Sequence, residues 1–177
     1  MGGSQVFLQA GESYKVEELL KGIAIASGHD AVVAMAEKVS GSVSDFVALM
    51  NEKAKSLGLT NTKFLNPHGL DTEGHVTTAH DMAIIARELI KHTSILKFTS
   101  IYEDYLKKND GSSIWLVNTN KLVRFYDGVD GLKTGFTKNA GYCLTSTAKK
   151  NNTRFITVVM GAETSDKRSS DTVNMLN

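Results

Sequence analysis

A lysine, a threonine and a glycine follow one another at Lys133-Thr134-Gly135, and Thr137 comes two residues later. On an edge strand, a fixed lysine offers a cation to a substrate carboxylate, and a threonine hydroxyl beside it can hydrogen-bond the same carboxylate. Gly135 would leave the strand edge uncrowded, so that a peptide could lie against it. The bare tripeptide is also frequent on surface strands by chance, so it indicates chemistry only together with a second signal.

That second signal is Ser27-Gly28-His29, which lies between two expected helices. A serine hydroxyl at a helix junction can relay a proton, although such a serine can also be a simple N-cap or helix breaker. The two segments together predict a site assembled from a helix junction and a strand.

The first half of the chain, residues 16–100, has the apolar spacing of helices. Residues three and four positions apart are apolar in three segments, at 16–26, 30–39 and 44–58, and a fourth helix is expected to begin at Thr77 or Thr78. Asp30 and Ser44 are the expected N-caps of the second and third helices. The stretch 59–76, rich in turn-forming residues, is expected to be a long and functional or well-packed loop.

Residues 101–165 change character and are expected to form an antiparallel sheet. Asn109-Asp110-Gly111 and the run 149–153 are hairpin signals, and 129–137 is expected to be a strand that carries the lysine. Residues 166–177 are expected to begin a helix. The order of helical cluster, antiparallel sheet and helix predicts the α+β class.

Composition excludes several classes of function. The formal net charge is +1, so a strongly basic nucleic-acid binder is not expected. Cys143 is the single cysteine, which rules out an internal disulfide and a cysteine-based zinc site. The histidines have no metal-binding spacing, so no metal and no cofactor are expected. No signal peptide and no apolar run of membrane-spanning length is present in the sequence.

The chain resembles the serine-type D-alanyl-D-alanine carboxypeptidases, the low-molecular-weight penicillin-binding proteins of the peptidase S11 family. The segments that carry the resemblance are 2–31, 61–71, 78–83 and 130–144, which together extend over essentially the whole chain. Their order, with a serine element before Lys-Thr-Gly, is that of the penicillin-recognising serine enzymes. The resemblance is closest to the branch found in spore-forming Gram-positive bacteria.

The resemblance implies a β-lactamase/penicillin-binding-protein transpeptidase-like fold, and a reaction that trims the terminal D-Ala of peptidoglycan stem peptides through an acyl-enzyme. It implies that Ser27 and His29 stand in the relay element, that Lys133 and Thr134 bind the terminal carboxylate, and that Thr137 and Arg168 are further carboxylate contacts. Gly135 would line the cleft. The implied partners are a stem peptide ending in D-Ala-D-Ala and β-lactam antibiotics, on the cell-wall side of the membrane, with roles in cell shape and sporulation.

Two features depart from the family pattern. His29 stands where the relay element has asparagine, and an imidazole offers fewer hydrogen-bonding atoms than an amide. The nucleophile motif S-x-x-K does not precede Ser27, and its two occurrences, from Ser94 and from Ser146, come in the wrong order. We therefore expect a partial catalytic domain over 1–177, incomplete at both ends, inactive alone, and connected to a membrane only through segments outside it.

Two other functions stay open at this point. A β-lactamase of the same fold would place a general-base glutamate four residues before an asparagine, and here Thr62 stands four residues before Asn66. The missing S-x-x-K and His29 would also fit a non-catalytic cell-wall-binding module.

Overall fold

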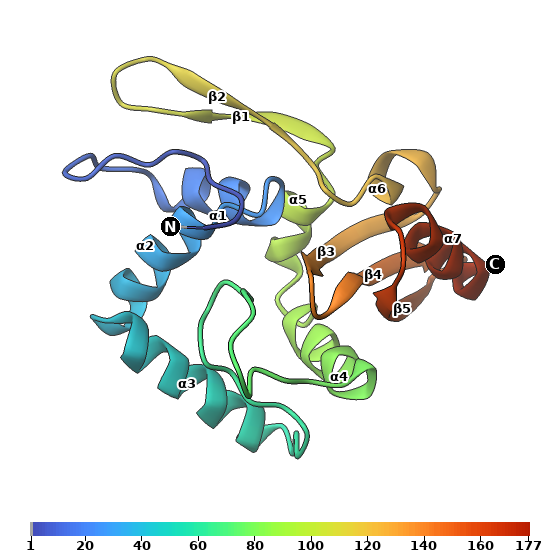
Figure 1. Cartoon of the computed structure of the whole chain (residues 1–177). Coiled ribbons are helices and arrows are strands. Elements are labelled where there is room, and N and C mark those ends of the chain that lie inside the picture. Colours follow the sequence, from blue (N-terminus) through green and yellow to red (C-terminus); the bar gives the residue numbers. More distant parts are fainter. Residues whose placement is uncertain (1) are drawn as a thin grey trace.

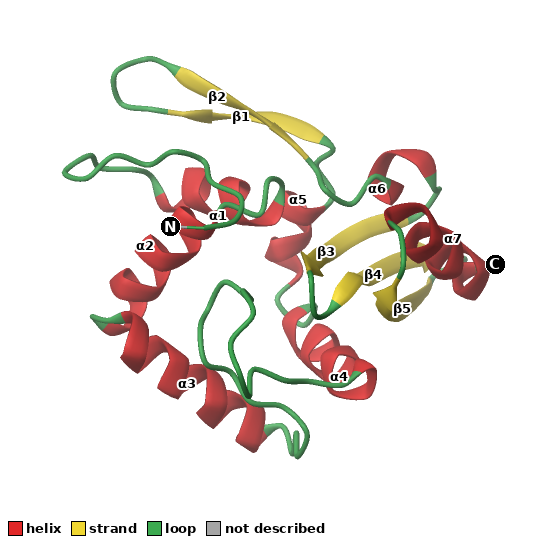
Figure 2. Ribbon diagram, in the orientation of Figure 1, coloured by secondary structure: helices red, strands yellow, loops and turns green. Residues whose placement is uncertain are grey.

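The computed structural model describes residues 2–177 and confirms the α+β class (Figure 1). Helices dominate the first half, and strands appear only after residue 100 (Figure 2). The helices are α1 (Val16–Ala24), α2 (His29–Ser40), α3 (Val43–Ser56), α4 (Ala79–Leu89), η1 (Thr93–Ile95), α5 (Leu96–Thr99), α6 (Leu122–Phe125) and α7 (Ser165–Leu176).

Side-chain caps set the start of three long helices. Ser42, Thr78 and Thr164 each accept a hydrogen bond from the backbone N–H three residues on, so that α3, α4 and α7 begin directly after them. The expected cap at Ser44 is therefore wrong by two residues. Thr78 confirms the expected start of the fourth helix.

Asp30 is not an N-cap, which corrects the sequence-based expectation. Gly28 occupies the N-cap position of α2, and Asp30 lies in the first turn. The Asp30 carboxylate instead accepts hydrogen bonds from the backbone N–H groups of Val6 (3.0 Å) and Leu8 (2.9 Å). The Asp30 side chain thus makes long-range hydrogen bonds in place of a local capping hydrogen bond. These bonds fix residues 6–8 against α2.

The five strands form two antiparallel sheets, whereas one was expected for residues 101–165. The first is the hairpin of β1 (Glu103–Lys107) and β2 (Ser113–Val117); the second has the order β3 (Val129–Thr137), β4 (Gly141–Lys150), β5 (Thr153–Ala162). The short helix α6 separates β2 from β3. Asn151 and Asn152, which join β4 to β5, both have positive φ, as a two-residue type I′ hairpin turn requires.

Each sheet is attached to its own apolar core. Leu106 and Leu116 of the first hairpin are buried with Leu19 and Ile25 beside α1. In the second sheet, Leu144 and Ala148 are buried with Leu176 of α7. The buried residues of the two sheets thus pack against different helices.

The loop between α3 and α4 projects into the space enclosed by the helices (Figure 1). Its base is closed by an antiparallel bridge between Lys63 and Val76. Asn51 of α3 exchanges two hydrogen bonds with the backbone of Phe64, at 2.8 and 2.9 Å. Because the base is fixed in this way, the tip of the loop is held among the helices, as expected for a well-packed loop.

Candidate active site

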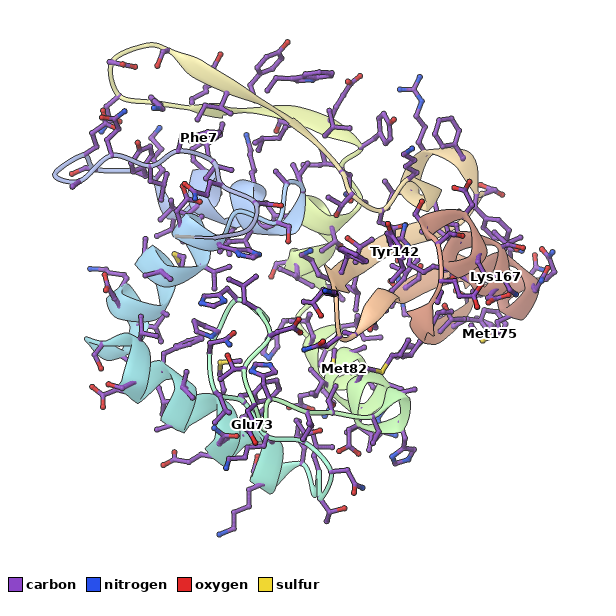
Figure 3. All side chains as sticks on the ribbon, in the orientation of Figure 1. Phe7, Glu73, Met82, Tyr142, Lys167 and Met175 are labelled. Atoms are coloured by element: carbon purple, nitrogen blue, oxygen red, sulfur yellow. The ribbon has the colours of Figure 1, made fainter. Side chains whose placement is uncertain are left out.

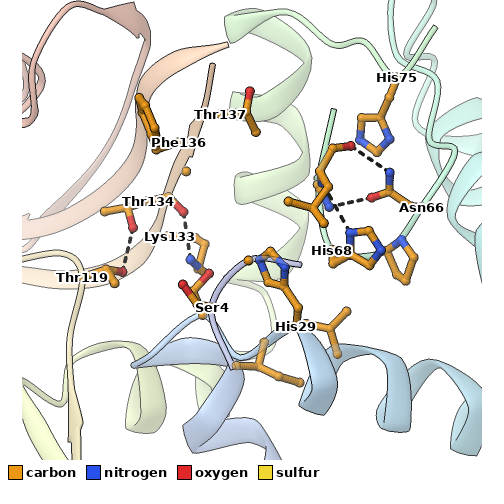
Figure 4. Close-up of a pocket in the computed structure, with 18 of the residues that line it drawn as sticks. Ser4, His29, Asn66, His68, His75, Thr119, Lys133, Thr134, Phe136 and Thr137 are labelled. Atoms are coloured by element: carbon orange, nitrogen blue, oxygen red, sulfur yellow. Dashed lines mark hydrogen bonds between the residues drawn. The ribbon is translucent and has the colours of Figure 1, made fainter. Parts of the chain in front are cut away.

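A cleft of about 860 Å³ lies between the α1–α2 junction, the α3–α4 loop, β3 and the start of α7. Figure 4 shows residues that line it from several of these elements. All seven residues selected from the sequence line this cleft, namely Ser27, His29, Lys133, Thr134, Gly135, Thr137 and Arg168. The fold thus brings together residues that lie far apart in the chain.

The strand that carries Lys133 is an edge strand, as its chemistry requires. β3 pairs with β4 on one side only, with Lys133 opposite Thr145 and Gly135 opposite Cys143. A Cβ placed on Gly135 would have its nearest contact at 3.9 Å, so the protein itself leaves the space over Gly135 open. The free edge of β3 can therefore accept an extended peptide.

Lys133 is a half-buried cation in this cleft. Its Nζ donates a hydrogen bond to the Thr134 carbonyl at 2.8 Å (Figure 4). Burial, and then the charge of Arg168, lower the pKa of Lys133 to about 8. Its proton is therefore held weakly in the free protein, and a carboxylate bound nearby would hold it more firmly.

Arg168, in the first turn of α7, is 7% exposed. Within residues 2–177 its buried Nε has no hydrogen-bond partner, and no salt bridge is formed by its guanidinium. No aspartate or glutamate is among the described residues that line the cleft. The charge of Asp166 favours the charged form of Arg168 without forming an ion pair with it, and a buried cation that forms no ion pair is unfavourable. The pair of Arg168 and Lys133 is consequently set up to bind an anion.

Thr119 is a cleft residue that the sequence analysis did not select. Its hydroxyl accepts a hydrogen bond from Thr134 Oγ1 at 2.7 Å, and its backbone N–H donates to the Ile25 carbonyl at 3.2 Å. Thr119 thus connects β3 to the end of α1. The sequence signal that could have pointed to Thr119 is the Asn-Thr-Asn triplet after an expected strand. In the structure, Asn118 and Asn120 are buried and hydrogen-bonded to backbone groups.

The Ser27-Gly28-His29 turn forms the opposite wall. Ser27 has φ +59°, a left-handed conformation that is uncommon for a residue with a side chain and that occurs often at functional sites. His29 is the first residue of α2, and its backbone N–H donates to the Ser4 carbonyl at 2.8 Å. The junction that the sequence predicted therefore exists, and both side chains line the cleft.

The α3–α4 loop adds Asn66, His68 and His75 to the cleft wall, which sequence reasoning did not assign to the site. The His68 ring stacks on the His29 ring with a centroid distance of 5.4 Å and an interplanar angle of 17°. Asn66 uses its amide within the loop, accepting from Gly69 N–H at 2.7 Å and donating to the Leu70 carbonyl at 2.9 Å. It is therefore a loop-forming residue.

Other sequence assignments are placed as follows. Thr137 Oγ1 accepts a hydrogen bond from the Ala140 N–H at 3.0 Å, which leaves its own proton for a ligand. Neither Ser94 nor Ser146 lines the cleft. Ser146 is fully buried in β4 and donates to the Gly131 carbonyl at 2.8 Å.

Among residues 2–177, no three His, Cys, Asp or Glu side chains gather into a group that could hold a metal ion. Within the same range, no helix has both the length and the apolar character needed to span a membrane.

Comparison with known proteins identifies the family of the chain. Residues 1–164 match the D-alanyl-D-alanine carboxypeptidase family, peptidase S11. The chain is 60% identical over 176 residues to D-alanyl-D-alanine carboxypeptidase DacF of Bacillus subtilis, covering 99% of this chain and 45% of that protein. It is 40% identical over 176 residues to DacC of Escherichia coli, covering 99% and 43%. The chain spans less than half the length of these curated relatives.

Solved structures show the same fold. D-alanyl-D-alanine carboxypeptidase DacD from Francisella tularensis superimposes with a TM-score of 0.92 at 32% identity, covering 99% of this chain and 54% of that one. Penicillin-binding protein D2 from Listeria monocytogenes, in its ampicillin-bound form, gives a TM-score of 0.86 at 32% identity, covering 99% and 72%. On the family match, the cleft and the shared fold, the chain belongs to the D-alanyl-D-alanine carboxypeptidase family, peptidase S11.

Proposed function

We propose that this chain is the substrate-holding part of a serine-type D-Ala-D-Ala carboxypeptidase, which removes the terminal D-Ala of peptidoglycan stem peptides through an acyl-enzyme. The observation that carries the proposal is Arg168, a buried guanidinium that forms no ion pair, beside Lys133 in a cleft that no acidic residue among those described lines. A free C-terminal carboxylate is the ligand that completes this pair.

Each site residue has a role that follows from its position. Lys133 and Arg168 neutralise the carboxylate, and the Thr137 hydroxyl donates a hydrogen bond to it. The Thr134 hydroxyl, which donates to Thr119 in the free protein, would turn from Thr119 to the carboxylate. The open edge at Gly135 leaves room for the peptide backbone along β3. The substrate would then lie along the strand.

On the opposite wall, Ser27 relays a proton to the leaving amine, and His29 contacts the substrate near its peptide bond. Support for this assignment is their position across the cleft from Lys133 and the strained backbone of Ser27. We propose them as catalytic residues on that basis.

The serines of the cleft lack the sequence context of the attacking serine. The serines that line the cleft are Ser4 and Ser27, and the residues three positions after them are Phe7 and Asp30, not lysine. A serine needs an adjacent base to attack an amide. We therefore propose that residues 1–177 alone bind substrates and β-lactams without forming the acyl-enzyme.

A β-lactamase-like hydrolase is the less favoured alternative. Thr62, in the place of that class's general base, donates to the Asp81 carboxylate at 2.7 Å and does not line the cleft. No carboxylate lines the described cleft, so the carboxylate base with which a β-lactamase activates water is missing from it. A non-catalytic cell-wall-binding module would keep the same carboxylate site. For each of these functions the site of action is the cell-wall side of the membrane.

The proposal is tested by comparing N-acetyl-D-Ala-D-Ala with its C-terminal carboxamide in calorimetric binding to the chain. We expect the free acid to bind and the carboxamide to bind at least about tenfold more weakly, since a charge-assisted contact contributes about 1.5–3 kcal/mol. Arg168→Ala should remove this preference for the acid. Lys167→Ala is the matched control, because Lys167 is exposed on α7 and pairs with Asp171 outside the cleft (Figure 3). Equal binding of acid and carboxamide contradicts the proposal.

A further inference from the structure

Backbone groups fix the neutral tautomers of the stacked His29 and His68 rings, and the two tautomers differ. The Gly2 carbonyl lies 3.2 Å from His29 Nδ1, and since a carbonyl only accepts, Nδ1 must carry the proton of the neutral ring. The Leu70 N–H lies 3.4 Å from His68 Nδ1, and since an N–H only donates, this Nδ1 must carry the lone pair.

The two Nε2 atoms therefore have opposite character when both rings are neutral. His29 offers an acceptor at Nε2, and His68 offers a donor at Nε2. No partner for either Nε2 is found among residues 2–177, and both side chains line the cleft. Together they present one acceptor and one donor side by side, which complements the N–H and the carbonyl of one residue in an extended peptide.

The pair is rigid, as a binding unit needs to be. Gly3, with φ +83°, lies so close to the Nδ1 edge of the His29 ring that any side chain at this position would collide with it. His68 covers one face of the same ring. The loop on both sides of His68 is in turn fixed by the Asn66 amide, which accepts from the Gly69 N–H and donates to the Leu70 carbonyl. Neither ring can turn without breaking a backbone hydrogen bond.

We propose that His29 and His68 form a composite site for one extended residue of the substrate, whose own N–H and carbonyl point to the same side: His29 Nε2 accepts the N–H and His68 Nε2–H donates to the carbonyl. This rests on the proposed function, because a bound D-Ala-D-Ala peptide supplies such a residue. It assigns His68, on the α3–α4 loop, as a further substrate-binding residue. It also explains how an imidazole at position 29 can serve where an amide would offer both a donor and an acceptor.

The first test reads the free chain. In a chain with ¹⁵N-labelled histidine, long-range ¹⁵N–¹H correlation at about pH 8 should show His29 protonated at Nδ1 and His68 at Nε2. The opposite protonation at either ring overturns the proposal without reference to any ligand.

The second test removes each hydrogen bond in turn. N-acetyl-D-Ala-D-Ala is compared with two depsipeptides in which an ester oxygen replaces one or the other N–H. One of the two esters should bind about three- to tenfold more weakly to the chain, as expected for one lost hydrogen bond. His29→Phe should abolish this difference, and His68→Phe, which keeps the stacked ring but not the donor, should weaken all three compounds alike.

The control variant is His92→Phe, since His92 is exposed and does not line this cleft. If both esters bind like the amide and His68→Phe changes nothing, while the carboxamide still binds weakly, the composite site is wrong and the carboxylate site stands. If none of the free acids binds, the proposed function itself is wrong, and the composite site is wrong with it.

Discussion

Lys133 and Arg168 face one cleft as two cations, and the charge of Arg168 contributes to lowering the pKa of Lys133 to about 8. Lys133 comes from an edge strand and Arg168 from the first turn of the last helix. Two like charges are held together here at a cost in stability, which an anionic ligand would relieve. This relationship makes the electrostatics of the cleft directly measurable.

Binding of N-acetyl-D-Ala-D-Ala should weaken as the pH rises through about 8, because Lys133 then loses the proton that attracts the carboxylate. The affinity should fall by up to about tenfold per pH unit until Lys133 is neutral. Calorimetry between pH 7 and 9.5 measures this. In Arg168→Ala, ¹⁵N detection of the Lys133 ammonium should find its pKa raised above the wild-type value. An unchanged Lys133 pKa would mean that the two charges do not interact.

Incubation of the 177-residue chain with excess benzylpenicillin should leave its intact mass unchanged, because neither Ser4 nor Ser27 in the cleft is followed three residues later by the lysine of an S-x-x-K motif. The same sample should release no D-alanine from a D-Ala-D-Ala peptide. A stoichiometric mass increase on Ser94 or Ser146 would show that an S-x-x-K was wrongly dismissed, and an adduct on Ser27 would overturn its relay role. A relative's segment carrying S-x-x-K, added in trans, should restore labelling if the partial-domain hypothesis is right.

Asn120→Ala should lower the free energy of unfolding by about 2–3 kcal/mol. Asn120 is 1% exposed, donates from Nδ2 to the Gly131 carbonyl and accepts at Oδ1 from the Leu122 N–H. Its removal leaves buried backbone groups without partners. Urea denaturation followed by circular dichroism measures the effect. Asn174→Ala, at an exposed position of α7, is the matched control, and a similar small loss in both variants would contradict the role of Asn120.

The unfolding free energy should decrease as the pH falls from about 7 to 5. Burial lowers the pKa of His68 and of His75 below the ordinary value of 6.5, so the unfolded chain binds more protons than the folded one in this range. The contribution of the two neutral rings to the unfolding free energy is fully present above about pH 6.5. It decreases below that pH, where the buried rings must take up protons. In His68→Phe, denaturation at pH 5, 6 and 7 should show a smaller decrease. An equal decrease in wild type and variant would assign the effect to other groups.

Local sequence determined most of the elements. Asn109-Asp110-Gly111 and the asparagine pair at 151–152 supply turn conformations that other residues adopt at a cost, so both hairpins were predictable. The positive φ of Gly58 ends α3 where expected. Lys133-Thr134-Gly135 could be read as a carboxylate site because the function needs only three consecutive residues on one strand.

Only the tertiary structure decided how the residues of the site come together and which further residues join them. The charge of Arg168, a residue that the sequence had already selected, acts on Lys133 because α7 packs back over β4 and β5. Thr119, which the sequence did not select, reaches Thr134 from between the buried Asn118 and Asn120. His68 reaches His29 because the loop base is fixed to α3 by Asn51. Long-range packing also decided that the strands divide into two sheets and that Asp30 binds residues 6–8. Periodicity and turn chemistry act over a few neighbouring residues, whereas these contacts depend on how buried faces pack across the whole chain.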